Sequence, residues 1–144
     1  MATKANPAEF EKLHSCLVEG NQPWTKNAPV LALGCTVLNF ALNGKPNAAA
    51  VHDLGLASAT LTFEATARGL FVHQMIGILP DKARETYQIP EGIQPVTGLA
   101  IGYLAEPDVL PEQYRARDLA ARPRKKLAEF VFGGKWAAPA EIAK

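Results

Sequence analysis

Cysteine and histidine are scarce in this sequence of 144 residues. The two cysteines, Cys16 and Cys35, stand alone without a Cys-x-x-Cys pair, which excludes a disulfide scaffold. Two buried, structural thiols in a reducing environment are favoured over a single disulfide between them. The three histidines show none of the spacings typical of metal ligands, so no metal site is predicted.

An excess of one charge and a long hydrophobic run are also missing. The chain has 15 basic and 14 acidic residues, a formal net charge of +1, so no overall field favours nucleic acid or a membrane. The longest apolar stretch, Ala28 to Leu42, is interrupted by proline and polar residues and is too short to span a bilayer. Because the N-terminus also lacks the apolar core of a signal peptide, we expect a cytoplasmic protein.

Motifs of the common catalytic sites are absent. The chain has no Gly-x-Gly-x-x-Gly, no Gly-x-x-x-x-Gly-Lys-Ser/Thr, no His-Glu-x-x-His and no Gly-x-Ser-x-Gly. His52 and Asp53 are adjacent, and on a helix adjacent side chains point about 100° apart, so they form no simple dyad. His73 lies in a strand-like run and is interpreted as a core or loop histidine. We predict no catalytic side chain, and any reaction would depend on a cofactor.

Apolar residues make up 48% of the chain, enough for the core of one ordinary domain. We predict a single domain over residues 1–132 and a C-terminal tail over 133–144. Alternating helix and strand patterns favour helices packed on one small sheet. The predicted elements are a helix from Asn6 to Gly20, a strand over 30–37, a helix over 48–68, a strand over 70–78, a helix over 80–87, a strand over 95–104 and a helix over 112–121.

The helix predicted over 48–68 is apolar on nearly every side. Between Ala48 and Ala67 its only charged residues are Asp53 and Glu64. A helix of this kind must be buried on nearly every side, and a monomer of this length has little material to cover it. Small residues around Gly55 would permit a close helix approach. The helix therefore favours a homodimer.

A basic segment lies near the C-terminus. From Arg115 to Lys126 there are six basic residues and one acidic residue, so the segment carries +5 and the rest of the chain −4. An ordinary solvated surface run is one interpretation of this segment. The other is an anion site, because Arg122 and Arg124 flank Pro123 and guanidinium groups form paired bonds to phosphate. A nucleic-acid surface is disfavoured, since Tyr114 is the only aromatic residue inside or beside the segment.

Four further segments follow one another in a recognisable order. The first is Trp24–Leu31, which contains Ala-Pro-Val, and the second is Asp53–Ala57 (Asp-Leu-Gly-Leu-Ala), which leads to Ala67–Leu70. The third is Ile89–Gly92, which is followed by Pro95-Val96 and by Ala100–Tyr103. The fourth is Arg122–Val131. In this order they resemble the nitroreductase family of FMN-dependent enzymes, over about Trp24 to Phe132. The resemblance implies an α+β fold with a mixed sheet flanked by helices, forming an intertwined homodimer with FMN at the subunit interface. It also implies that NAD(P)H gives hydride to the flavin, which reduces a nitroaromatic, a quinone or a similar small molecule.

The resemblance also assigns cofactor-binding residues. The loop Gln74, Met75, Ile76 and Gly77 would run beside the flavin ring, with backbone N–H groups, chiefly those of Ile76 and Gly77, facing the flavin N5. Backbone donors need no acid or base in the loop. The matching residues for the FMN phosphate are Arg122 and Arg124, with Lys125 nearby.

The N-terminal region departs from the family pattern. The usual Arg-Ser-x-Arg-like helix and Asn-x-Gln-Pro-Trp-like segment do not precede Met1, so the sequence resembles an N-terminally truncated member. Asn21-Gln22-Pro23-Trp24 is superficially similar to that segment, but its position matches the later tryptophan, and no flavin-binding role is given to Asn21. Two alternatives to the enzyme therefore stay open. One is a catalytically impaired relative that keeps the dimeric core as a binding or structural module, and the other is an anion- or nucleic-acid-binding domain.

Overall fold

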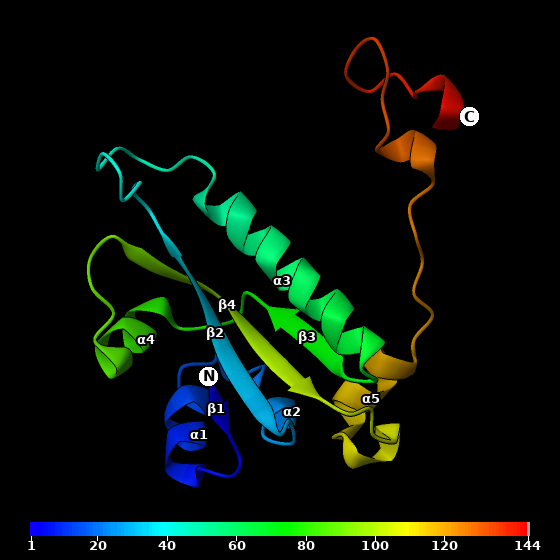
Figure 1. Cartoon of the computed structure of the whole chain (residues 1–144). Coiled ribbons are helices and arrows are strands. Elements are labelled where there is room, and N and C mark those ends of the chain that lie inside the picture. The colour runs from blue at the N-terminus through cyan, green and yellow to red at the C-terminus, as the bar shows by residue number, and fades with distance from the viewer. Residues whose placement is uncertain (144) are drawn as a thin grey trace. The chain divides into compact units, whose positions relative to one another are not determined.

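A four-stranded sheet organises the first part of the chain (Figure 1). The structure is a computed structural model that describes residues 1–143 and divides into two units, Met1–Pro111 and a second unit that begins at Glu112. The strands lie in the order β1-β2-β4-β3. They span Ala2–Thr3 (β1), Val30–Val37 (β2), Phe71–Met75 (β3) and Ile93–Gly102 (β4). The domain boundary predicted at residue 132 stays a prediction.

Helices on a single small sheet confirm the α+β fold class. Every strand pair found within residues 1–143 is antiparallel, so the parallel pair that a mixed sheet contains is not among them. The reason lies in the central strand. β4 separates β2 from β3 and runs antiparallel to both, so β2 and β3 point the same way without touching as neighbours.

The main core lies between the sheet and α1 (Pro7–His14). As predicted, Asn6 caps this helix, and its Oδ1 accepts a hydrogen bond from the Glu9 N–H at 3.3 Å. The helix ends at His14, well before Gly20, because the chain turns there to bring Leu17 into a bridge with Ile78. The buried residues of this core are Ala2, Phe10, Leu13, Leu17, Leu31, Met75, Ile78 and Ala100.

Two short elements near the N-terminus were not predicted. β1 has only two residues, and α2 (Gln22–Thr25) has four. Neither is long enough to show a hydrophobic period. Both nevertheless matter for packing, since Ala2 is buried beside α1 and Trp24 of α2 packs against the core.

The long helix α3 (Ala50–Ala67) covers the other face of the sheet. Thr36 of β2 ties the start of α3 to the sheet through a 2.7 Å bond from its Oγ1 to the Ala50 carbonyl oxygen. The predicted burial of this helix on nearly every side is not found within the chain, because only Ala50, Ser58 and Ala65 of α3 are buried and its outward side chains lie in solvent. Phe63 is 76% exposed, and the other large apolar side chains exposed on α3 are Val51, Leu56 and Leu61.

Two helices complete the predicted set. In the first unit, α4 (Pro80–Tyr87) is followed by Gln88 in the left-handed conformation. The Arg84 guanidinium donates to three carbonyl oxygens of the turn that leads into β4. In the second unit, α5 spans Glu112–Leu119. Short 3-10 turns occur at Pro107–Val109, Leu127–Glu129 and Glu141–Ala143.

The second unit has a folded backbone but no core of its own. Paired backbone bonds, Gly133 N–H to the Ala138 oxygen and Ala140 N–H to the Val131 oxygen, both 2.9 Å, close a loop near its end. Trp136 at the tip of this loop is exposed. No side chain among residues 112–143 is buried. Since burial of apolar surface is the main stabilising term of folding, this unit needs contacts beyond its own residues.

Candidate functional site

The segment that joins β3 to α4 turns sharply at Ile76 and Gly77. The Met75 side chain lies in the core, whereas the Ile76 side chain is 87% exposed. The Gln74 amide points to the opposite face of the sheet, where Nε2 donates to the Ser58 oxygen at 3.1 Å and to the Thr62 Oγ1 at 2.8 Å. Of the four predicted loop residues, Ile76 and Gly77 present their backbone at the surface of the turn.

The carbonyl groups of this turn are all held from within the first unit. The Met75 oxygen accepts from Thr97 Oγ1 at 3.0 Å, and the Ile76 oxygen from the Ile78 N–H at 2.8 Å. The Gly77 oxygen accepts two bonds, from the Val18 N–H at 3.1 Å and from Asn21 Nδ2 at 3.0 Å. The turn therefore has its acceptors fully engaged.

The donors of the same turn are free. Among residues 1–143, no group accepts a hydrogen bond from the N–H groups of Ile76 and Gly77. The turn thus has two adjacent backbone N–H groups without a partner, while its carbonyl oxygens already accept hydrogen bonds. Such a pair of donors suits a ligand atom that carries negative charge. The turn therefore fits an acceptor atom of an electron-rich ligand.

A glycine is required at position 77 by space. A Cβ there would lie 2.4 Å from Asn21 Nδ2 and 2.9 Å from Val18 Cγ2, both inside the normal limit of contact. The segment that contains Val18 and Asn21 thus packs directly on the backbone of the turn. Close packing of this kind fixes the turn before any ligand arrives.

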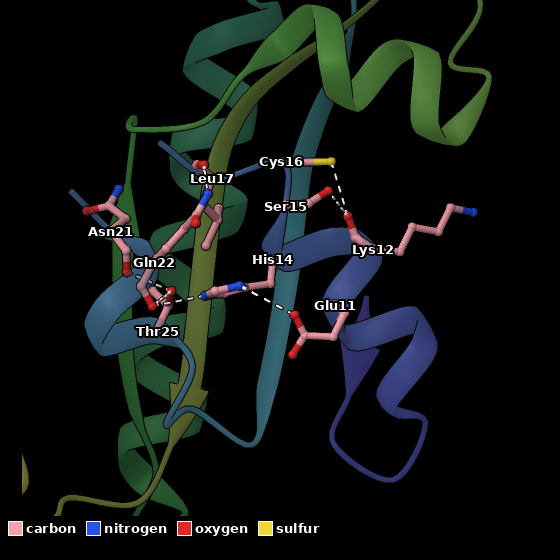
Figure 2. Close-up of polar contacts among 9 residues, drawn as sticks. All are labelled: Glu11, Lys12, His14, Ser15, Cys16, Leu17, Asn21, Gln22 and Thr25. Carbon is pink, nitrogen blue, oxygen red and sulfur yellow. Dashed lines mark hydrogen bonds and ion pairs between the residues drawn. The ribbon is translucent and has the colours of Figure 1, made fainter. Parts of the chain in front are cut away.

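The packing segment is itself cross-linked by polar contacts (Figure 2). The His14 Nε2–H donates to the Gln22 oxygen at 2.9 Å, and Gln22 Nε2 donates to the Leu17 oxygen at 2.8 Å. Thr25 is fully buried, and its Oγ1 donates to the Asn21 oxygen at 2.7 Å. These bonds join the end of α1 to α2 and hold Asn21 in place against the turn.

His73 lies on β3, two residues before the turn begins. Its ring is 4.5 Å from the Trp24 ring, centre to centre, in a tilted arrangement. Burial lowers the pKa of His73, because the charged imidazolium loses water. The prediction of a core or loop histidine is wrong, because His73 is an exposed residue of the strand β3 whose ring packs against Trp24.

The predicted phosphate residues lie in the second unit, while the turn belongs to the first. Arg122, Arg124 and Lys125 are exposed and lie in irregular chain after α5. Arg124 Nη1 donates to the Arg122 oxygen at 3.0 Å and to the Pro123 oxygen at 3.3 Å. The guanidinium therefore folds back on its own backbone and keeps its other donors for an anion.

The sequence reasoning missed two residues whose side chains donate hydrogen bonds to the turn, Asn21 and Thr97. Asn21 lies 56 positions from Gly77 in the chain and Thr97 lies 22 positions from Met75. An alternation pattern marks Thr97 only as one residue of a strand, and no local pattern connects either residue with the turn. A three-dimensional fold is needed to find them.

Comparison with known proteins identifies the fold. No family model matches the sequence. A solved structure described as an oxidoreductase containing FMN is 31% identical and superposes with a TM-score of 0.87, covering 95% of this chain and 70% of that one. A nitroreductase family protein from Clostridium difficile, 23% identical, has the same fold with a TM-score of 0.59, covering 88% of this chain and 67% of that one. The chain belongs to the nitroreductase family.

A curated protein is also similar in sequence to this nitroreductase-family chain. It is an uncharacterized 15.4 kDa protein from Mycolicibacterium smegmatis, 34% identical over 90 residues. The matched region spans 62% of this chain and 60% of that relative. The structural match to the FMN-containing oxidoreductase, and not this uncharacterized relative, confirms the resemblance of the segments from Trp24 to Phe132 at the level of family and fold.

The described residues contain no group of side chains that could bind a metal ion and no helix that could cross a membrane. Within residues 1–143, no three side chains of His, Cys, Asp or Glu come together in a way that could hold a metal ion. None of the helices in that range is both long enough and apolar enough to cross a bilayer. Cys16 and Cys35 are free thiols. Cys16 is buried, as predicted, whereas Cys35 is only half-buried, so the prediction of two buried thiols is wrong for Cys35.

Proposed function

We propose that this nitroreductase-family protein is a homodimeric oxidoreductase that binds FMN and uses it to pass electrons from NAD(P)H to a nitroaromatic, a quinone or a similar small acceptor. The observation that carries the proposal is the pair of unpartnered N–H groups at Ile76 and Gly77, beside carbonyl groups that are all engaged. FMN, when bound, supplies the centre that accepts and donates hydride.

The residues of the turn suit the ring of FMN. Hydrogen-bond donors fixed in advance stabilise negative charge on a ligand, and they need no reorganisation when that charge develops. Ile76 and Gly77 would donate to the ring, while Gln74 and Met75 would support the turn from β3. Gly77 fits this role by its lack of a side chain, since any Cβ would displace the segment behind it.

The basic residues suit the phosphate of FMN. Arg122, Arg124 and Lys125 are exposed cations within a short stretch, and Arg–phosphate bonds combine charge with paired geometry. We propose that they bind the phosphate, while the turn at Ile76 and Gly77 binds the ring.

A homodimer is part of the same proposal. The outward face of α3 exposes Leu56 and Phe63, and no side chain among residues 112–143 is buried, so both units present apolar surface that needs a partner. A second copy of the chain would cover both surfaces. The free thiols agree with the cytoplasmic location that we propose for the protein.

The test compares FMN with riboflavin, which has the same ring and no phosphate. We expect the protein to quench FMN fluorescence on binding and to oxidise NAD(P)H in the presence of FMN and a quinone. Arg124→Glu should weaken FMN binding about tenfold or more, since a charge-assisted hydrogen bond contributes roughly 1.5–3 kcal/mol, and should leave riboflavin binding unchanged.

Arg117→Glu is the matched control, because it reverses one charge on α5 outside the predicted phosphate residues. Equal loss of FMN affinity in both variants would mean that the basic run acts only as a general field. FMN binding without NAD(P)H turnover would favour the impaired relative, and absence of FMN binding would refute the proposal.

A further inference from the structure

The two free donors of the turn lie on two successive peptide groups, and each group is oriented by its own carbonyl. All peptide bonds described in the structure are trans, so the N–H and C=O of one peptide group point in opposite directions. The Ile76 N–H shares its peptide group with the Met75 oxygen, and the Gly77 N–H shares its group with the Ile76 oxygen. Whatever binds those oxygens therefore decides where the two donors point.

Thr97 sets the direction of the first donor together with the pairing of Met75 and Gly98 between β3 and β4. It is buried, and its Oγ1 lies 3.0 Å from the Met75 oxygen and 3.2 Å from the Gly98 oxygen. A hydroxyl has one proton to donate, and the shorter distance favours the Met75 oxygen. With that oxygen held towards Thr97, the Ile76 N–H is turned away from it.

Asn21 sets the direction of the second donor through one intermediate peptide group. Asn21 Nδ2 and the Val18 N–H hold the Gly77 oxygen, and this fixes the peptide group that also carries the Ile78 N–H. The Ile78 N–H in turn holds the Ile76 oxygen at 2.8 Å. The Gly77 N–H belongs to the same peptide group as the Ile76 oxygen and points the opposite way, so it is turned away from the interior.

Resting on the FMN site proposed above, we infer that Thr97 and Asn21 are positioning residues for the flavin: Thr97 orients the Ile76 N–H and Asn21 orients the Gly77 N–H. Neither side chain needs to touch the flavin. Their effect is on the reduced form, which carries more negative charge and gains more from fixed donors than the oxidised form does.

The test uses isosteric variants and measures how tightly the protein binds oxidised and reduced FMN. Asn21→Asp keeps the shape of the side chain, removes the donor and places a carboxylate against the Gly77 oxygen. Thr97→Val keeps the shape and removes the hydroxyl. For each variant we expect about a tenfold loss of preference for reduced over oxidised FMN, which lowers the midpoint potential of this two-electron couple by about 30 mV.

Two matched variants separate this effect from general damage. Asn6→Asp makes the same change of charge, and its side-chain oxygen still caps α1. Thr97→Ser keeps the hydroxyl and loses only a methyl group. Both should keep the wild-type potential. If Thr97→Val does not fold, Asn21→Asp tests the inference by itself, since the two side chains act on different peptide groups.

Amide hydrogen exchange gives a readout that needs no flavin. In the wild-type protein without FMN, the Ile78 amide should exchange slowly because it donates to the Ile76 oxygen. Asn21→Asp should speed its exchange at least tenfold, and Asn6→Asp should not. A wild-type protein that does not bind FMN would refute the proposed function and this inference together. FMN binding by the wild type, with unchanged potential and exchange in Asn21→Asp and unchanged potential in Thr97→Val, would refute the inference alone.

Discussion

Replacing Gly77 by alanine perturbs the turn at the point where it is packed most tightly. The backbone at Gly77 is in a conformation open to any residue, so the effect comes from space and not from φ. The added methyl group would lie 2.4 Å from Asn21 Nδ2 and 2.9 Å from Val18 Cγ2. Both neighbours must shift, and both residues also donate to the Gly77 oxygen.

The size of the effect follows from these contacts. The Asn21 amide is the end of a side chain and can rotate away, which costs its hydrogen bond, about 0.5–1.5 kcal/mol. The contact with Val18 is harder to relieve, because its N–H is bonded to the turn, and overpacking of this kind costs about 1–3 kcal/mol. We therefore expect a loss of roughly 2 kcal/mol in the free energy of unfolding, or about 5–8 °C in melting temperature for a chain of this size.

The assay is thermal unfolding without FMN, followed by FMN titration, both at one fixed protein concentration. Displacement of Asn21 should also misorient the donors of the turn and weaken FMN binding about tenfold, the equivalent of one charge-assisted bond. Gly20→Ala is the control, because a Cβ at Gly20 meets no atom within 4 Å. A Gly77→Ala protein that matches both the wild type and Gly20→Ala in stability and FMN affinity would refute the reasoning.

Three further outcomes are expected. Phe63→Asp, on the exposed face of α3, should shift the protein from dimer to monomer in sedimentation at micromolar concentration, whereas Lys82→Ala on α4, with the same change of net charge, should not. Burial beside Trp24 lowers the pKa of His73, so below about pH 6.5 the unfolded chain binds more protons than the folded chain and stability falls as the pH falls. His73→Gln should therefore reduce the dependence of the melting temperature on pH between pH 7.5 and 5.5. An equal pH dependence in the variant and the wild type would contradict this. Burial raises the pKa of the Cys35 thiol, so iodoacetamide at pH 7.5 should modify it much more slowly in the folded protein than in urea, as mass spectrometry would show; equal rates would contradict the burial.

Elements with their own local signals were predictable from the sequence. Asn6 and Pro7 mark the start of α1, and the span Val30–Val37 was predicted at its observed limits because Pro29 precedes it and the apolar run is continuous. The end of α1 was not predictable, since it depends on Leu17 reaching Ile78, a contact made across the sequence. β1 and α2 were not predicted from the sequence, because each is formed through packing and shows no hydrophobic period of its own.

The candidate site divides in the same way. The turn at Ile76 and Gly77 was located by its resemblance to a family, but nothing local explains why its donors are free. That property depends on Asn21, Val18 and Thr97, whose bonds to the turn exist only once α2 and β4 have packed beside it. Residues that position a site from other elements leave no motif, because their spacing in the chain is set by the fold as a whole.

The two halves of the proposed FMN site differ in how far they are built in advance. The turn belongs to a unit with its own core, so its donors are oriented before a ligand arrives and little entropy is lost there on binding. The basic segment belongs to a unit without a buried side chain, so Arg124 and Lys125 must be ordered by contacts made from outside that unit. The ordering cost therefore falls on the phosphate half. Dimer formation would remove part of that cost, and FMN affinity should rise with protein concentration until the dimer is complete.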